Sequence, residues 1–519
     1  MFRFEDIPSW TTPVVLAEVA AAHPDRTFVT SEDGELTYGE TAGLVAAVAA
    51  GFTERGLAPG DRVGVLLTNG IRWCACALAA HAAGLTVVPL NTWYHADELS
   101  AVAERANLRA LITQDRLFGQ DGRELVANVA AAGTPILTWN RGAAMPDGIP
   151  EVTVADPLAA LRAAPTGESA DALVLFTSGS TATPKAVRLT QAGVVRTAHA
   201  IGERQGVTGT DRLWFGSPLF FVYGCSNALP NALTHAATLC VQEKFDAAGA
   251  LAFIERHRCT GYYGIGPITR ALAAHPDLAV RDISSLRLGT ANATPEDLRL
   301  AIEVLGVRDV CNAYGLTEGH GHTTITHHTD PPEVRTLSQG TALPTQELRI
   351  VVDGTPVGTG EPGEIQIRGL ISPGYLDDGD RTAQGFTPDG WFRTGDLGAL
   401  DADGRLTYLG RSHELMKVNG INVSPLEVER VLVEHEEVEQ AFVFGLPTPE
   451  GDETVGCVLV SAVAHDELAD RVRTWLRGRI AGYKVPGTMR VVTAAQLPLT
   501  ATGKVSKRSM REQLSGSVT

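Results

Sequence analysis

A run of hydroxyl side chains followed by a lysine lies in the middle of the chain. It supplies hydroxyl donors, a glycine that lets a ligand approach the backbone, and a cation: Thr177, Ser178, Gly179, Ser180, Thr181 and Lys185. This combination suits the phosphates of a nucleotide. It is not a Walker A loop, in which Gly-Lys-Ser/Thr runs straight into a helix, because residues 186–190 read as a strand. Taken alone, the segment is explained equally well as a hydroxyl-rich surface turn.

Later motifs separate these two interpretations. They are NAYGLTE at 312–318, GEIQIRG at 363–369, WFRTGD at 391–396, GR at 410–411, KVNG at 417–420, YKVP at 483–486 and PLTATGK at 498–504. With the hydroxyl-rich loop, and in this order, they resemble the signature of the ANL superfamily of adenylate-forming enzymes, most closely its acyl-CoA ligase branch. The resemblance covers nearly the whole chain.

The elements that must position these motifs read as an α/β protein. Strand and helix patterns alternate over residues 34–130, which predicts parallel strands with helices on both faces. The resemblance implies a large N-terminal domain of parallel-rich sheets layered with helices over 1–410. It further implies a hinge over 411–417, with His413 as its hinge residue, and a small mobile α+β domain over 418–519.

The resemblance also assigns residues to a nucleotide. Those that it places around adenine, ribose and phosphates, besides the hydroxyl-rich loop, are Thr290, Ala291, Asn292, Asn312, Ala313, Tyr314, Thr317, Asp396 and Arg411. Tyr314 is expected to stack on adenine, Asn312 to reach its amino group and Asp396 to accept both ribose hydroxyls. A carboxylate beside a triphosphate requires a cation between them, so Glu318 is expected to hold Mg²⁺. Without the resemblance, Thr317 and Glu318 would more simply cap a helix.

Two lysines are expected to serve separate half-reactions. ATP and the acid first form an acyl-AMP, in which Lys504 bridges the carboxylate and the α-phosphate. The small domain then alternates to a second pose that brings Lys417 and Gly420 to the site, where the glycine leaves room for the pantetheine of coenzyme A. The resemblance therefore implies ATP or acyl-AMP, Mg²⁺ and coenzyme A as ligands.

An aromatic segment indicates the kind of acid. The resemblance places five residues along the acyl pocket: Phe220, Phe221, Tyr223, Gly224 and Gly315. Many family members carry histidine where Phe221 stands, whereas this segment is similar to that of benzoate-type aryl-CoA ligases. A plain aromatic core is the simpler explanation of such residues; their place in the motif order favours a pocket for a hydrophobic, cyclic or aromatic carboxylic acid.

One position departs from the family. Ala182 stands where glycine, less often serine, is usual, and Ala186 also replaces a frequent glycine. At a positive φ, alanine costs about 1–2 kcal/mol, and its Cβ would crowd the β- and γ-phosphates. Adenylation is then impaired while the thioester step is spared, so that another enzyme could supply the adenylate. Alternatively, the loop shifts slightly and ATP still binds.

Other functions remain open at this point. A carrier protein could replace coenzyme A as acceptor, because its phosphopantetheine arm is identical. A non-catalytic adenylate-binding protein would also fit the change at Ala182, and luciferase-like oxidation is a remote option. Synthetic acyl-AMP offered with free coenzyme A would separate these functions.

Composition narrows the partners and the compartment. The 519 residues carry a formal net charge of −17, which argues against nucleic acid, and no basic run suggests a membrane surface. The uncharged run 73–90 is divided by Gly84 and Pro89, so it reads as a buried helix followed by a strand. Seven cysteines in apolar segments and a start unlike a signal peptide predict a cytoplasmic protein with reduced thiols.

Overall fold

A six-stranded sheet carries the two strands that flank the hydroxyl-rich loop. The computed structural model describes residues 7–177, 184–418, 421–448, 453–462, 466–499 and 505–515. The strands of this sheet, in spatial order, are β10 (Lys185–Thr190), β9 (Asp171–Thr177), β4 (Thr86–Pro89), β3 (Arg62–Val65), β5 (Ala110–Thr113) and β8 (Ile136–Thr138). All neighbours are parallel except β9 and β10, which form an antiparallel pair.

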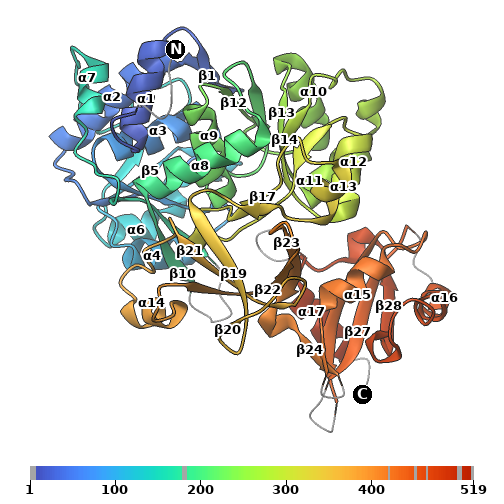
Figure 1. Ribbon diagram of the computed structural model, residues 1–519. Helices are drawn as coiled ribbons and strands as arrows, with labels where there is room; N and C mark the ends of the chain where they lie inside the picture. Colours follow the sequence, from blue (N-terminus) through green and yellow to red (C-terminus); the bar gives the residue numbers. More distant parts are fainter. Residues whose placement is uncertain are drawn as a thin grey trace. The chain divides into compact units, whose positions relative to one another are not determined.

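A seven-stranded sheet lies beside the six-stranded sheet, and its strands come from residues 27–311 (Figure 1). Its order is β15 (Asp309–Cys311), β14 (Leu288–Asn292), β13 (Gly261–Ile265), β11 (Arg212–Phe215), β12 (Thr238–Val241), β1 (Thr27–Ser31) and β2 (Gly34–Thr37). Only β1 and β2 pair antiparallel. Parallel strands need crossover helices, and the predicted α/β fold with parallel-rich sheets is confirmed.

Helices cover both sheets. The longer ones are α1 (Thr12–Ala22), α2 (Tyr38–Glu54), α3 (Ile71–Ala82), α4 (Ala96–Arg105), α8 (Gln191–Gln205), α10 (Ala247–His257), α11 (Gly266–Ala273) and α12 (Pro295–Glu303). The shorter ones are α5 (Gly122–Leu125), α6 (Ala127–Ala131), α7 (Pro157–Arg162), α9 (Leu229–Thr234), α13 (Pro332–Leu337) and α14 (Gly379–Gly385). In Figure 1, α10, α11 and α12 lie against β13 and β14, where their apolar residues form one buried cluster.

The run 73–90 is the predicted buried helix and strand, α3 and β4. Among the residues that the structure describes, no helix is both long and apolar enough to span a bilayer. All seven cysteines are buried and form no disulfide, and burial raises the pKa of Cys76 to about 12, so its thiol stays protonated.

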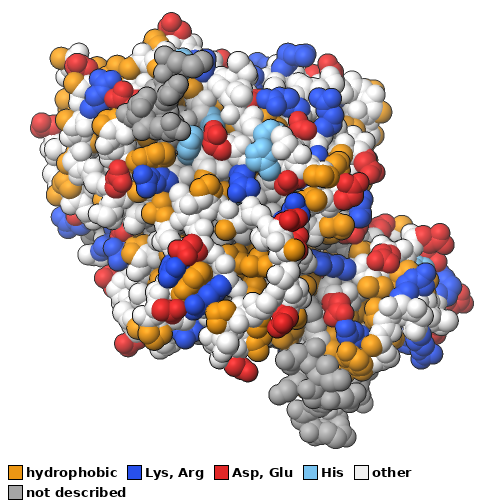
Figure 2. Space-filling view, viewed as in Figure 1, with side chains coloured by type: hydrophobic (Ala, Val, Ile, Leu, Met, Phe, Trp, Pro, Cys, Tyr) orange, Lys and Arg blue, Asp and Glu red, His pale blue; other side chains and the backbone are white. Residues whose placement is uncertain are grey.

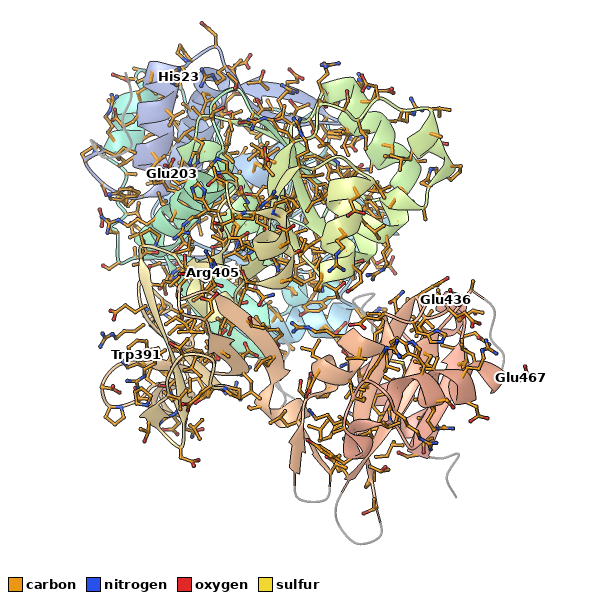
Figure 3. All side chains as sticks on the ribbon, turned by 45° about the vertical axis from the view of Figure 1, so that its right-hand side comes forward. His23, Glu203, Trp391, Arg405, Glu436 and Glu467 are labelled. Atoms are coloured by element: carbon orange, nitrogen blue, oxygen red, sulfur yellow. The ribbon has the colours of Figure 1, made fainter. Side chains whose placement is uncertain are left out.

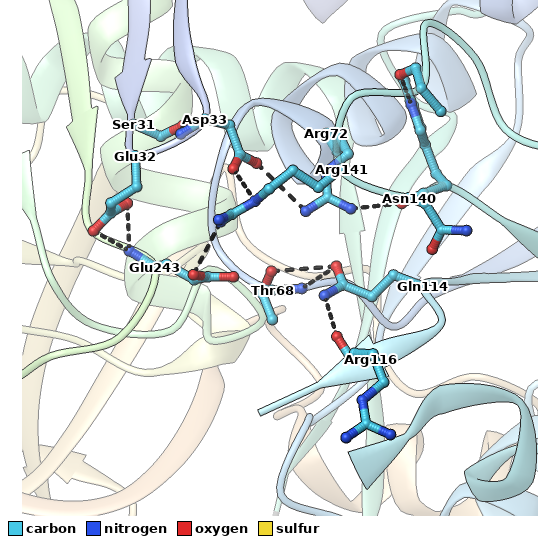
Figure 4. Close-up of polar contacts among 12 residues, drawn as sticks. Ser31, Glu32, Asp33, Thr68, Arg72, Gln114, Arg116, Asn140, Arg141 and Glu243 are labelled. Carbon is cyan, nitrogen blue, oxygen red and sulfur yellow. Dashed lines mark hydrogen bonds and ion pairs between the residues drawn. The ribbon is translucent and has the colours of Figure 1, made fainter. Parts of the chain in front are cut away.

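Charged side chains join the two sheets at the β1–β2 turn (Figure 4). Asp33, in that turn, pairs with Arg72 of α3 at 3.4 Å and also with Arg141, which follows β8. Arg141 reaches Glu243 at 3.1 Å, just beyond β12. These pairs connect segments far apart in sequence, so they fix the two sheets against each other.

The chain divides into two compact units. The first comprises Met1–Leu348, Ile367–Phe392 and Asp403–Leu406, and the second Arg349–Gln366, Arg393–Ala402 and Thr407–Thr519. The second unit contains the sheet β26 (Gln440–Pro447), β27 (Glu453–Val460) and β28 (Thr488–Val492), with α15 (Pro425–Leu432), α16 (Asp466–Leu476) and α17 (Lys507–Ser515). It is the expected small α+β fold. The boundary at 410 and the hinge at 411–417 stay predictions.

Candidate active site

The hydroxyl-rich loop is held at both ends by the β9–β10 pair. Thr177 and Lys185 are directly opposite each other in the antiparallel register. The strand predicted after the loop is confirmed as β10. Ser178, Gly179, Ser180, Thr181 and Ala182 lie outside the described residues. Because β9 is buried through Leu173, Val174 and Leu175, the ends of the loop are anchored in the sheet core.

Tyr375 connects the loop to the predicted magnesium ligand. The Lys185 ammonium lies 5.6 Å from the centre of the Tyr375 ring, and the Tyr375 hydroxyl donates to Oε1 of Glu318 at 2.7 Å. Burial, and then the charge of Glu318, raise the pKa of Tyr375, so the hydroxyl keeps its proton and remains a donor. Sequence reasoning missed this residue. Its backbone neighbours Gly374 and Leu376 hydrogen-bond to β10, which no local pattern reveals.

We expect Tyr375→Phe to lower kcat/KM for ATP about tenfold. A hydrogen bond to a charged group contributes about 1.5–3 kcal/mol, and without it the Glu318 carboxylate loses its orientation. Steady-state kinetics of adenylate formation would measure the change. Tyr262→Phe is the matched control, because it removes a buried hydroxyl bonded to Thr269 in the core instead. Equal kinetics for the two variants would contradict a positioning role for Tyr375.

The turn that carries Glu318 is fixed by a buried histidine. Glu318 lies in the short helix η4 (Thr317–Gly319), and His320 follows with φ 60°. The Thr190 backbone N–H donates to Nε2 of His320 at 3.2 Å. Burial lowers the pKa of His320 to about 4, so the ring is neutral and can accept this bond. A Cβ on Gly193, in the first turn of α8, would lie 1.9 Å from Nε2 of the same ring, so glycine here leaves room for the histidine.

The predicted adenine residues come from neighbouring strands. Thr290 of β14 is paired with Cys311 of β15, which places Thr290, Ala291 and Asn292 beside the start of the NAYGLTE motif. Ala313 and Tyr314 form β16 (Ala313–Tyr314), which pairs with β17 (Thr324–Ile325) and, through it, with β18 (Thr341–Ala342). Tyr314 is 6% exposed. Their contact with adenine stays a prediction.

Asn312 is already engaged by the backbone. Its side-chain amide donates to the carbonyl of Ser338 at 2.9 Å, and its Oδ1 accepts from the N–H of Ala313 at 3.0 Å. An amide oxygen has two lone pairs, so Oδ1 can still accept from an adenine amino group. The expected contact is therefore compatible with this arrangement.

An aromatic cluster contains the predicted acyl-pocket phenylalanines. The rings of Phe220 and Phe221 are 4.6 Å apart, and Trp93 packs edge-on against both, at 5.5 and 5.9 Å. Trp93 is 40% exposed, and sequence reasoning missed it because it follows a different strand, β4. The Asn69 side chain holds the segment before Phe220 in place: it accepts from the N–H of Leu219 and donates to the carbonyl of Ser217.

The other three predicted pocket residues have structural contacts of their own. The Tyr223 hydroxyl is shared between the carbonyls of Gly264 and Thr290, and its ring lies 5.8 Å from that of His322. A Cβ on Gly224 would lie 2.7 Å from Cα of Leu219, and one on Gly315 would lie 1.8 Å from the carbonyl oxygen of Gly321. Both glycines are thus required by backbone packing, whatever ligand is bound.

In the second unit, the predicted ribose ligand is buried and paired. Asp396 lies on β22 (Phe392–Leu400) and Arg411 ends β23 (Leu406–Arg411), the neighbouring strand in a sheet completed by β19 (Gln346–Val352), β20 (Thr355–Pro356) and β21 (Gly363–Gly369). Asp396 is 2% exposed, and its Oδ1 lies 3.1 Å from Nε of Arg411. Arg411 thus balances the charge of the buried carboxylate.

Of the residues assigned to the two predicted poses, the structure describes the backbone of Lys417. Lys417 is on β24 (Met416–Val418), which pairs with β25 (Ile421–Val423) so that Val418 faces Ile421. Gly420 is outside the described residues, as is Lys504, which lies between the bridged Leu499 and Val505. The side chains of Lys417 and His413 are also outside what the structure describes.

Comparison with known proteins agrees with this arrangement. The AMP-binding enzyme family matches residues 16–376, and the AMP-binding enzyme C-terminal domain matches residues 427–504. A 7a-methyl-1,5-dioxo-octahydro-indenyl propanoyl:CoA ligase from Mycobacterium tuberculosis is 33% identical over 97% of this chain and 98% of its own. Feruloyl-CoA synthase from an Amycolatopsis species is 29% identical over 98% and 99%.

A solved structure extends the likeness to three dimensions. The o-succinylbenzoate CoA synthetase from Bacillus subtilis, in complex with its acyl-adenylate intermediate, superposes with a TM-score of 0.81. It is 25% identical and covers 96% of this chain and 97% of its own.

Proposed function

Because the chain belongs to the AMP-binding enzyme family and is an acid–CoA ligase that works through an acyl-AMP, we propose that its acid is hydrophobic and cyclic or aromatic. The observation that carries this proposal is the cluster of Trp93, Phe220 and Phe221. Flat aromatic walls bury a ring better than a flexible chain, and they offer no charged partner to a polar acid. The named relatives support it, since the acids in their names contain rings.

In this proposal the site residues divide the chemistry as follows. A carboxylate does not acylate a thiol because its leaving group is too poor, and transfer to AMP supplies a good one. Lys185 provides a cation where the loop rejoins the sheet. Glu318, oriented by Tyr375, offers a hard oxygen ligand, so Mg²⁺ fits at this carboxylate and would neutralise phosphate charge there. Asp396 accepts the ribose hydroxyls. Lys504 then serves adenylation, and the loop from Lys417 to Gly420 serves thioester formation.

The acceptor is coenzyme A in this proposal. A carrier protein would present the same phosphopantetheine arm, but the relatives are named as CoA ligases or synthases. One assay distinguishes coenzyme A from a carrier protein as the acceptor. The acyl-AMP of a cyclic acid is supplied with free coenzyme A, and the thioester formed is measured directly. Failure of free coenzyme A, together with turnover on a phosphopantetheinylated carrier protein, would overturn this choice.

We expect Phe221→Ala and Trp93→Ala to change the preferred acid more than the affinity for nucleotide. Altering an apolar wall shifts discrimination by about 1–3 kcal/mol, or about 5- to 150-fold in relative kcat/KM. The measurement is kcat/KM over a panel of aromatic, alicyclic and linear acids. Phe118→Ala is the control, because it removes an exposed aromatic side chain that lies after β5, outside the cluster. An unchanged order of preference among the acids would show that these aromatic residues do not contact the acyl group and serve only in packing.

Adenylation is the slower half-reaction in our proposal. Ala182 adds a methyl group where the family has glycine, in the loop expected to hold the outgoing pyrophosphate. The thioester step involves no pyrophosphate, so it is spared. ATP–pyrophosphate exchange is expected to be slow in the wild type and faster in Ala182→Gly, while thioester formation from acyl-AMP is equal in both. Brisk exchange by the wild type that Ala182→Gly leaves unchanged would show an ordinary acyl-CoA ligase.

A further inference from the structure

Two histidines and a glutamate converge on α8, outside the residues assigned to nucleotide, acid or coenzyme A. His199 and Glu203 are four residues apart on this helix and therefore share one face. His235 directly follows α9, whose C-terminal end packs against that face. One ligand atom from each side chain lies within 4.8 Å of the other two. Figure 3 labels Glu203, and Figure 2 shows histidine side chains reaching the surface of the first unit.

The hydrogen bonds around His235 assign its ring protons. Nδ1 lies 3.0 Å from Oγ1 of Thr234 and 3.1 Å from the carbonyl oxygen of Asn231. The Thr234 hydroxyl donates its own hydrogen to that carbonyl. Nδ1 must therefore carry a hydrogen, which leaves Nε2 as the ligand atom facing Glu203. A metal-binding histidine commonly donates its other N–H to a backbone carbonyl in this way.

Nε2 of His235 lies close to the carboxylate of Glu203. It lies 3.3 Å from Oε1 of Glu203. A lone pair that faces a carboxylate is repelled unless a proton or a metal ion lies between them. Two ligands held about 2.0–2.1 Å from a tetrahedral Zn²⁺ are themselves about 3.3 Å apart. The spacing of this pair thus already matches a metal site.

The packing of α8 keeps the two imidazoles together. Their ring centres are 5.0 Å apart with an interplanar angle of 24°. A Cβ on Gly202 would lie 2.2 Å from Cε1 of His235 and 2.4 Å from Oδ1 of Asn231. Glycine at this position therefore makes the space in which the His235 ring lies on the helix.

We propose that His199, Glu203 and His235 bind one divalent transition-metal ion, for which Zn²⁺ is the best match. Two imidazoles and one carboxylate form a known three-ligand zinc set, and imidazole disfavours Mg²⁺ and Ca²⁺. The Glu203 side chain is 66% exposed, so water completes the coordination. Bound metal clamps the C-terminal half of α8 to the end of α9. The two lie side by side in Figure 1.

The test is a zinc titration of the untagged full chain after treatment with EDTA, read by competition with a chromophoric zinc chelator. The wild type is expected to bind one Zn²⁺ and to unfold at a higher temperature with the metal than in EDTA. His199→Gln and His235→Gln should each weaken binding more than about 100-fold, since loss of even a supporting partner of a ligand costs about 10–100-fold. Both variants should also lose the thermal shift.

Two further variants keep the test decisive. His23→Gln is the control, because His23 directly follows α1 and is not one of the three converging ligands. It should bind zinc as the wild type does. Glu203→Gln changes an exposed side chain at nearly constant volume, so it should fold normally yet bind zinc weakly. Absence of zinc binding by the wild type, or equal binding by all four variants, would overturn the site and leave a His235–Glu203 ion pair.

Discussion

Lys504→Ala, introduced into an Ala182→Gly background, is expected to slow ATP-dependent adenylation about 100- to 1,000-fold. Removing one donor that stabilises transition-state charge typically costs this much. The lysine is proposed to act only in the adenylation pose, so thioester formation from supplied acyl-AMP should change only about two- to threefold. ATP–pyrophosphate exchange reports the first half-reaction, and a thioester assay on synthetic acyl-AMP reports the second. The glycine background raises the starting rate against which the loss is measured.

Arg508→Ala provides the control for this variant. Arg508 lies four residues further on, in α17, and its side chain is 89% exposed, where it pairs with Glu512. Removing that charge should leave both half-reactions nearly unchanged. If Lys504→Ala slowed the two half-reactions equally, or matched Arg508→Ala, the assignment of Lys504 to one pose would be wrong.

Gly420→Leu is expected to impair the other half-reaction, thioester formation, and to spare adenylation. The leucine side chain would fill the passage proposed for pantetheine, so thioester formation from acyl-AMP should fall about 100-fold or more, a barrier increase of about 3 kcal/mol. Nucleotide binding and pyrophosphate exchange should persist. Equilibrium binding of acyl-AMP, measured beside the thioester rate, separates loss of chemistry from loss of structure.

The second unit offers a matched control for this glycine. A Cβ on Gly478 would meet only the carbonyl oxygen of Trp475, at 3.9 Å, and its φ is not positive. Gly478→Leu should therefore be tolerated in both half-reactions. Undiminished thioester formation by Gly420→Leu would show that the loop from Lys417 to Gly420 does not line the coenzyme A passage.

The sequence predicted the local elements better than the contacts between them. Residues 186–190 alternate in a way that favours a strand, and β10 confirms it, because strand patterning depends on neighbouring residues. Tyr375 and Trp93 were missed because each reaches its neighbours through long-range packing. Phe220 and Phe221 were found through a motif, yet the third aromatic side chain of their cluster, Trp93, comes from the segment after β4, more than a hundred residues earlier.

The histidine–glutamate cluster illustrates the same limit. His199 and Glu203 are four residues apart, a spacing that places them on one face of the helix α8. Nothing local connects them to His235, which is brought to them by the packing of α9 on α8 and by the absence of a side chain at Gly202. Contacts of this kind depend on tertiary structure and have no periodic signal in the sequence.

The division of the chain into interleaved pieces restricts how the protein can be recombined. The second unit is assembled from 349–366, 393–402 and 407–519, so the backbone passes between the units five times. A single genetic crossover in the predicted hinge at 411–417 would transfer the C-terminal family domain at 427–504 as one block. It would leave behind 349–366 and 393–402, together with Asp396 and its strand. A functional chimaera that exchanges the whole unit therefore needs three coordinated replacements, and its activity depends on whether Asp396 and Arg411 come from the same parent.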